Sequence, residues 1–152
     1  MNNLDHLEFE TDKNRQEDEF WGVTSENSAS VLHDGNGASE RVFDLEERTA
    51  LFGEAIIRFA RKIPFDPVNN RLIDQLVGAG TSVGANYCEA NDGVSRKDFI
   101  HKIGICRKEA RETRFFLRMV VCSEPTLKDD ARILWKEAKE LNLIFSAIWR
   151  KK

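Results

Sequence analysis

The sequence predicts an all-α protein, an antiparallel up-down-up-down four-helix bundle preceded by a disordered acidic N-terminal tail. Three observations lead to this prediction. Apolar residues recur at alternating steps of three and four in four separate segments, which is the helical period. Capping residues or helix breakers separate these segments. No segment shows the sustained two-residue alternation of a half-buried strand.

The tail, residues 1–40, is predicted to be mostly disordered. It holds ten acidic and two basic residues, a net charge of −8, and has too little apolar surface to offset the entropy of ordering. Phe20 and Trp21 are an aromatic pair in this acidic setting, either a short docking element or a locally sticky patch. Residues 41–152 carry +5, and such an asymmetry hints at polyanion binding or autoinhibition by the tail.

The bundle is predicted to occupy residues 41–152. Its first helix begins at Asp44, because an aspartate with Glu47 three residues later is a variant of the capping box. This helix ends before Pro64, which cannot continue it. The four helices are expected near residues 44–63, 69–91, 96–122 and 127–150.

The second helix contains Gly78, Gly80 and Gly84, which allow two interpretations. A phosphate-binding loop is disfavoured, because this glycine spacing is one residue too long for the dinucleotide fingerprint and no Gly-Lys-Ser/Thr follows. The flanking residues have helical periodicity instead. Three glycines cost a helix about 1 kcal/mol each relative to alanine. We therefore expect a helix whose small face lets its neighbours approach closely.

The third and fourth helices carry matching start signals. Ser95 precedes Asp98 by three residues and Thr126 precedes Asp129 by three, as in a capping box. Apolar residues then recur at steps of four and three in both segments. Four such segments joined by short connections predict antiparallel neighbours.

Several apolar residues fall outside the predicted inner seam. If they were exposed together they would form patches of the kind found at interaction surfaces, which predicts self-association. The alternative is a wider buried stripe with scattered surface hydrophobes. The residues are Ile57, Ile100, Ile105, Phe115, Phe116, Leu143, Ile144 and Trp149.

The bundle offers no recognisable catalytic set. A di-iron site needs Glu-x-x-His from two helices, whereas His101 is the only histidine in residues 41–152. The nucleophile motif G-x-S-x-G does not occur either. From these two observations we expect no catalytic residues, no metal and no cofactor. Three cysteines without a C-x-x-C pair favour a reducing compartment, and neither a secretory signal nor a membrane span is visible. A cytoplasmic protein is expected.

A basic stripe on the third helix is the best candidate for a functional surface. Four arginines recur there at steps of four, three and four, without an acidic residue three or four positions away. Arginine suits bidentate phosphate contact and stacking on exposed bases, so RNA is one reading. The other is that the arginines pair with acids of neighbouring helices. The predicted nucleic-acid-binding residues are Lys97, Arg107, Lys108, Arg111, Arg114 and Arg118.

Asn86 and Glu89 lie beside the small-residue face of the second helix. Between packed helices they would need hydrogen-bond partners, and an arginine of the third helix could serve Glu89. No histidine or second acid nearby completes a catalytic set, which favours a structural role for both.

Four blocks of sequence resemble one known family. They are Phe43-Asp44-Leu45, the segment Thr81-Ser82-Val83-Gly84-Ala85-Asn86-Tyr87-Cys88-Glu89-Ala90, Ser95-Arg96-Lys97-Asp98-Phe99 and Lys108-Glu109-Ala110-Arg111-Glu112-Thr113. The family comprises four-helix bundle proteins encoded in intervening sequences of bacterial 23S ribosomal RNA genes. It is similar in fold to the accessory variability protein of diversity-generating retroelements. The resemblance covers roughly residues 42–150.

The resemblance implies a small cytoplasmic bundle, often a homopentamer, with suspected RNA binding. Together with the basic stripe it predicts a non-enzymatic homo-oligomer that binds structured RNA or other nucleic acid through the third helix. The alternative is a protein-interaction scaffold or accessory subunit, for example of a reverse transcriptase, without a direct RNA role.

Overall fold

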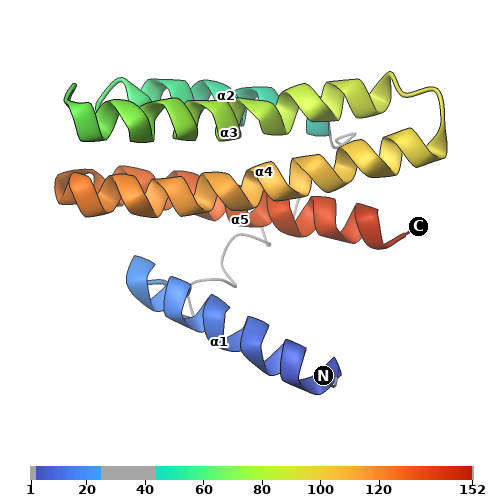
Figure 1. Cartoon of the computed structure of the whole chain (residues 1–152), viewed down its shortest axis with the longest axis horizontal. Coiled ribbons are helices and arrows are strands. Elements are labelled where there is room, and N and C mark those ends of the chain that lie inside the picture. Colours follow the sequence, from blue (N-terminus) through green and yellow to red (C-terminus); the bar gives the residue numbers. More distant parts are fainter. Residues whose placement is uncertain (1–2, 25–43, 152) are drawn as a thin grey trace, which may run out of the picture. The chain divides into compact units, whose positions relative to one another are not determined.

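The computed structural model describes residues 3–24 and 44–151, and all regular structure in these ranges is helical. The elements are α1 (Asn3–Trp21), α2 (Leu45–Ala60), α3 (Pro67–Asn91), α4 (Arg96–Ser123), the 3-10 helix η1 (Pro125–Leu127) and α5 (Lys128–Arg150) (Figure 1). The chain divides into two compact units, residues 1–40 and residues 41–152.

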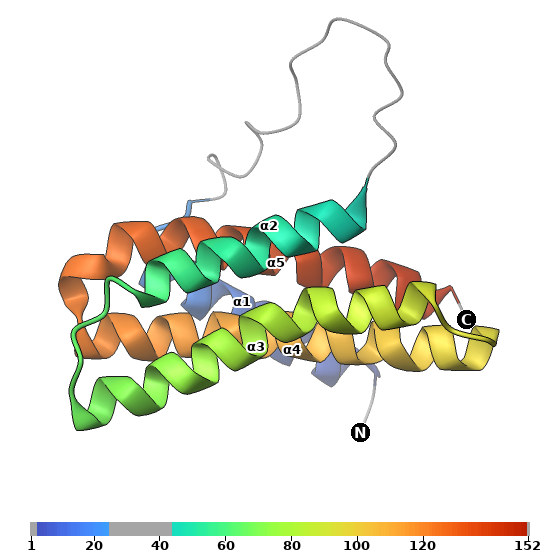
Figure 2. The ribbon, with the colours of Figure 1, turned by 90° about the horizontal axis from the view of Figure 1, so that it is seen from above.

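Helices α2 to α5 form the predicted antiparallel bundle, and their ends lie within three residues of the predicted ones. Helices α2 and α3 form one layer, and α4 and α5 form the other (Figure 1). Seen from above, α3 lies over α4 and α2 lies over α5 (Figure 2). Apolar residues that recur at steps of three and four along these helices form the buried core. Fully buried side chains of this core include Ile56, Leu76, Val83, Ile103, Leu117, Leu141 and Phe145.

Side-chain caps fix the starts of α2, α3 and α4. The Asp44 carboxylate accepts from the backbone N–H groups of Glu46 and Glu47 at 3.1 Å. The Ser95 hydroxyl accepts from the N–H of Asp98, also at 3.1 Å. Asp66 caps α3, with Pro67 at the first helical position, which suits proline because its missing N–H would have no partner there. The predicted Thr126 cap is wrong: η1 leads directly into α5, which has no side-chain cap.

The glycines of α3 allow α2 to approach closely, as predicted. A Cβ atom on Gly80 would lie 2.8 Å from Cγ1 of Ile56, and one on Gly84 would lie 3.3 Å from the carbonyl oxygen of Thr49. Gly78 faces open space, with nothing within 4 Å of such an atom. The close approach therefore depends on two of the three glycines.

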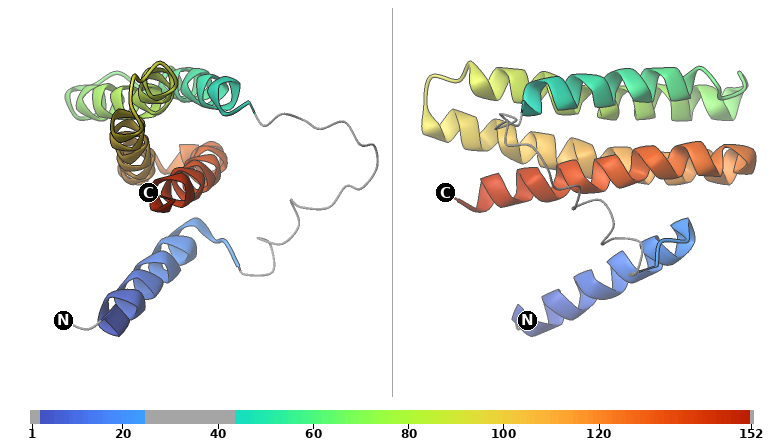
Figure 3. Two further views of the ribbon diagram at one scale, coloured as in Figure 1. Left: turned by 90° about the vertical axis from the view of Figure 1, so that its right-hand side faces the viewer. Right: turned by 180° about the vertical axis from the view of Figure 1, so that it is seen from behind.

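Helices α2 and α5 are in much less extensive contact than the pairs α2–α3, α3–α4 and α4–α5. We call this region the α2–α5 seam. The end-on view in Figure 3 shows these two helices at the side of the bundle away from α3 and α4. Arg48 of α2 forms ion pairs with Glu137 at 2.6 Å and Glu140 at 2.7 Å. These contacts hold the pKa of Arg48 above its ordinary value, chiefly through the hydrogen bond to Glu137. These ion pairs join α2 to α5.

Helix α1 corrects the expectation of a mostly disordered tail over residues 3–21. The disorder prediction rested on apolar content, whereas long charged side chains are good helix formers. Opposite charges also stand four residues apart at Lys13 and Glu17, a spacing that supports an isolated helix. Gly22 ends the helix at φ 66°, with the Val23 N–H donating to the carbonyl of Asp18 at 2.9 Å. Residues 1–2 and 25–40 of the predicted tail lie outside the described residues.

The aromatic pair of the tail lies in the last turn of α1. The rings of Phe20 and Trp21 meet edge to face, with centroids 5.0 Å apart. Whether this pair is a docking element stays a prediction.

Candidate nucleic-acid interface

The outward face of α4 carries a line of exposed basic side chains. Cys106, Ala110 and Leu117 face the core and are fully buried, so the opposite side of the helix faces solvent. Four of the six predicted nucleic-acid-binding residues are exposed there. They are Lys97, Lys108, Arg111 and Arg118, and the exposed His101 lies among them.

The other two predicted residues pack against tryptophan rings of α5. The guanidinium carbon of Arg107 lies 4.3 Å from the ring centroid of Trp149, and that of Arg114 lies 5.4 Å from the ring centroid of Trp135. Cations over the faces of such rings are held by the ring quadrupole. Two of the four arginines therefore join α4 to α5, through tryptophan rings that were not among the partners considered from the sequence. The nucleic-acid role of the six residues stays a prediction.

The surroundings of Arg107 explain how this contact forms. Gly104 leaves room for the tryptophan, because a Cβ there would lie 3.2 Å from Nε1 of Trp149. The side chain of Asn142 donates to the backbone carbonyl of Arg107 at 2.8 Å. Helix α5 thus fixes both the backbone and the side chain of Arg107. A sequence signal for this was present, because Trp135 and Trp149 are fourteen residues apart and share one face of a helix.

The two polar residues of α3 have partners other than those expected. Glu89 forms an ion pair with Lys102 of α4, not with an arginine. The side-chain amide of Asn86 donates to the carbonyl of Ser82, one turn earlier on its own helix, at 2.9 Å. Glu54, another acid that could have met the arginines, pairs with Arg58 at 3.3 Å. Both Asn86 and Glu89 therefore have structural contacts.

Phe115 lies within the exposed basic face. Its side chain is 55% exposed, although phenylalanine usually lies in the core. It meets the half-buried Phe116 edge to face, with ring centroids 5.3 Å apart at 83°. Both rings line a shallow hollow on α4 together with Lys108, Arg111 and Glu112. From the sequence, Phe115 is one of the off-seam hydrophobes, and its position beside these basic residues was not predicted.

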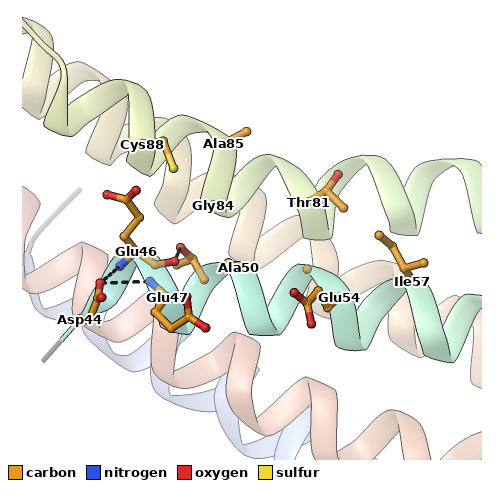
Figure 4. A pocket seen from close by; sticks show the side chains of 12 residues that line it. Asp44, Glu46, Glu47, Ala50, Glu54, Ile57, Thr81, Gly84, Ala85 and Cys88 are labelled. Atoms are coloured by element: carbon orange, nitrogen blue, oxygen red, sulfur yellow. Dashed lines mark hydrogen bonds between the residues drawn. The ribbon is translucent and has the colours of Figure 1, made fainter.

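A second concave surface runs between α2 and α3 (Figure 4). Its floor contains small residues such as Gly53 and Gly84, and Glu46, Glu47 and Glu54 line it. Because acidic groups repel phosphate, this groove is unsuited to nucleic acid. Within residues 3–24 and 44–151, no group of three or more histidine, cysteine or acidic residues is arranged to hold a metal ion.

The buried cysteine of α4 is held in its neutral form. Burial raises the pKa of the Cys106 thiol to about 12. Cys88 is an exposed residue, but partial desolvation of its thiol also raises its pKa. Because the thiolate is the nucleophile, neither residue is activated for chemistry.

The architecture of residues 44–151 gives the class of protein, an all-α helical bundle. The family model described as 23S rRNA-intervening sequence protein matches residues 43–147. The chain belongs to this family, which confirms the resemblance found in its four sequence blocks.

A solved structure is similar over most of the bundle. It is a protein of unknown function from the S23 ribosomal protein family of Bacteroides thetaiotaomicron VPI-5482, with 28% sequence identity and a TM-score of 0.60. The similarity covers 68% of this chain and 96% of that chain. No match was found among curated proteins. None of the helices in the described ranges combines the length and apolar character needed to cross a membrane.

Proposed function

We propose that this protein is a non-enzymatic, homo-oligomeric bundle that binds structured RNA through the outward face of α4. The observation that carries the proposal is that Lys97, Lys108, Arg111 and Arg118 are exposed on one helix face. The family description, which refers to 23S rRNA, supports RNA as the partner.

The geometry of this face suits a phosphate backbone. Lys97 and Arg118 are 21 residues apart, so at 1.5 Å per residue the basic face is about 31 Å long. Arginine presents several donors in a planar fork that matches phosphate, and lysine adds point charge. Glu112 is the acidic residue in the hollow beside Phe115 and reduces the positive charge there. Arg107 and Arg114 contribute by holding α4 against α5.

Replacing Arg111 and Arg118 together with alanine tests the proposal. Binding to fragmented rRNA should weaken, and the slope of log affinity against log salt should become shallower by about 1.4–1.8, because each lost phosphate contact contributes about 0.7–0.9. Fluorescence anisotropy over a salt series measures both quantities. The thermal midpoint should stay within a few degrees, since the two residues are exposed on the helix surface.

The matched control replaces the exposed Arg58 and Arg71 of α2 and α3 with alanine, which removes the same charge elsewhere. This variant should keep most of the affinity of the unaltered protein. Equal loss in both variants would mean that net charge alone matters and would contradict the assigned face. Unchanged affinity in the Arg111/Arg118 variant would also contradict it.

A protein-interaction scaffold, for example an accessory subunit of a reverse transcriptase, is the second candidate function. The open α2–α5 seam favours it, because Leu51 and Ile133 are exposed there beside the ion-paired residues, at 50% and 70%. Exposed apolar surface of this kind is typical of interaction sites. Negligible RNA affinity at physiological salt would favour this second function.

A further inference from the structure

The exposed ring of Phe115 differs in its surroundings from the other exposed hydrophobes of the bundle. Helical spacing places Arg111 four residues before it and Lys108 seven residues before it, so all three lie on one side of α4. The same side chains line one shallow hollow. An aromatic face and two phosphate-binding groups are therefore combined within about two helical turns.

The ring of Phe115 is also supported in one orientation. Phe116 meets it edge to face at 5.3 Å and 83°, an arrangement that aromatic pairs prefer. Because Phe116 is half-buried, it connects the exposed ring to the body of the bundle. A supported ring loses little conformational entropy when a ligand stacks on it, which favours a stacking platform over a mobile side chain.

We infer that Phe115 stacks on an unpaired base of the bound RNA while Lys108 and Arg111 contact the adjoining phosphates. The inference rests on the proposed function and deepens it, because it names single-stranded RNA, or a loop within a folded RNA, as the ligand. Bases in a duplex are already stacked and paired, whereas unpaired bases can be splayed onto an aromatic ring. The ring would then favour unpaired segments within the structured RNA.

Charge argues against a second copy of the same patch as the occupant. Two copies facing each other here would bring together two basic side chains, Lys108 and Arg111, and one acidic side chain, Glu112, from each chain. Each hollow keeps a net positive charge, and like net charges across an interface are unfavourable. An RNA backbone supplies the opposite charge.

The test compares two probes and three substitutions of Phe115 in the full chain, with one substitution each at Phe65 and Arg111 for comparison. The probes are a fluorescent oligoadenylate and a blunt RNA duplex of equal charge. Phe115→Ala should lower the affinity for oligoadenylate by about 5- to 140-fold, the range that corresponds to losing one stacked base. Affinity for the duplex should change less than twofold. Phe115→Tyr should retain most of the oligoadenylate affinity, and Phe115→Leu should lose most of it, because leucine is apolar but has no aromatic face.

Phe65→Ala is the matched control, because Phe65 is 87% exposed and lies between α2 and α3. It should leave both affinities unchanged. If the unaltered protein binds neither probe, the proposed function fails and the inference falls with it. If both probes bind, Arg111→Ala weakens them and Phe115→Ala does not, the function stands and the stacking inference is overturned. A fall in the oligomeric mass of the Phe115→Ala variant, with unchanged RNA affinity, would show that the ring contacts another copy and would also overturn it.

Discussion

At the scale of single residues, position around α4 separates side chains of the same type. Arg107 and Arg114 stack on tryptophans of α5, whereas Arg111 and Arg118, only a few residues away, are exposed. All four share one broad arc of the helix, so sequence spacing grouped them together. The positions of two rings on the neighbouring helix decided which of the four arginines are exposed and which pack against α5.

Cys106 provides a residue-scale prediction about pH. Its thiol has a pKa of about 12 in the folded protein, above the ordinary value near 9, and an unfolded chain therefore loses this proton first. The buried neutral thiol therefore stabilises the folded protein fully below about pH 9, and this contribution is lost as the pH rises towards about 12. Cys106→Ala should make the loss of stability between about pH 7 and about pH 10.5 shallower, as measured by urea midpoints.

The control for this prediction is Cys122→Ala, which removes an exposed thiol. Its urea midpoints should depend on pH as steeply as those of the unaltered protein. Tyr87 also has a pKa raised by burial and should contribute the same sign in every variant. Parallel pH curves for the Cys106 variant and the unaltered protein would contradict the prediction.

At the scale of elements, the contact between α2 and α3 depends on which glycines meet a neighbour. The sequence showed that α3 has a small face and that this face should be packed. It did not show which of Gly78, Gly80 and Gly84 would carry the contact, because helix rotation is set by both partners. In the structure Gly80 meets Ile56, Gly84 meets Thr49 and Gly78 meets open space.

Alanine substitutions at Gly78 and Gly80 should therefore have opposite effects. Gly78→Ala should stabilise the bundle by up to about 1 kcal/mol through helix propensity alone. Gly80→Ala gains the same propensity, but its Cβ would lie 2.8 Å and 2.9 Å from the two γ carbons of Ile56. Overpacking of this kind costs about 1–3 kcal/mol, and the β-branched isoleucine is stiff, so the variant should be destabilised overall.

Urea denaturation of both variants measures this difference. The two free energies of unfolding should fall on opposite sides of that of the unaltered protein. Equal stabilisation by both substitutions would contradict the close approach at Gly80. Equal destabilisation would instead mean that Gly78 also meets a neighbour, for example in an oligomer.

At the scale of the whole bundle, the four helices do not enclose the core evenly. Arg48 of α2 and Lys62, which lies just after the end of α2, form ion pairs with acids of α5. Leu51 and Ile133, three residues along from members of these pairs, remain exposed. Of the eight off-seam residues named from the sequence, Ile57, Phe115 and Leu143 are exposed and five are half-buried. A wider stripe therefore accounts for most of them, and self-association stays a prediction that the open seam supports.

Mass measurement by light scattering tests self-association through this seam. Leu51→Gln combined with Ile133→Gln should reduce the oligomeric mass towards that of the monomer, because it removes apolar surface that a second copy would cover. Val94→Gln is the control, since Val94 is 97% exposed in the connection between α3 and α4. A monomeric unaltered protein, or an oligomer unaffected by the double substitution, would contradict the prediction.

The sequence by itself determined the fold class and, within three residues, the helix bounds, because periodicity, caps and helix breakers act locally and repeat along the chain. The family followed from the resemblance of four sequence blocks, which the family model confirms. It misjudged residues 3–21, where charged side chains support a helix that apolar content did not indicate.

Only the tertiary structure decided which arginines face solvent, that Glu89 meets Lys102, and that Phe115 lies exposed beside Lys108 and Arg111. The physical reason is that such contacts depend on how far each helix is rotated and shifted against its neighbours. That arrangement is set by the packing of all four helices together and is not encoded in the spacing of any one of them.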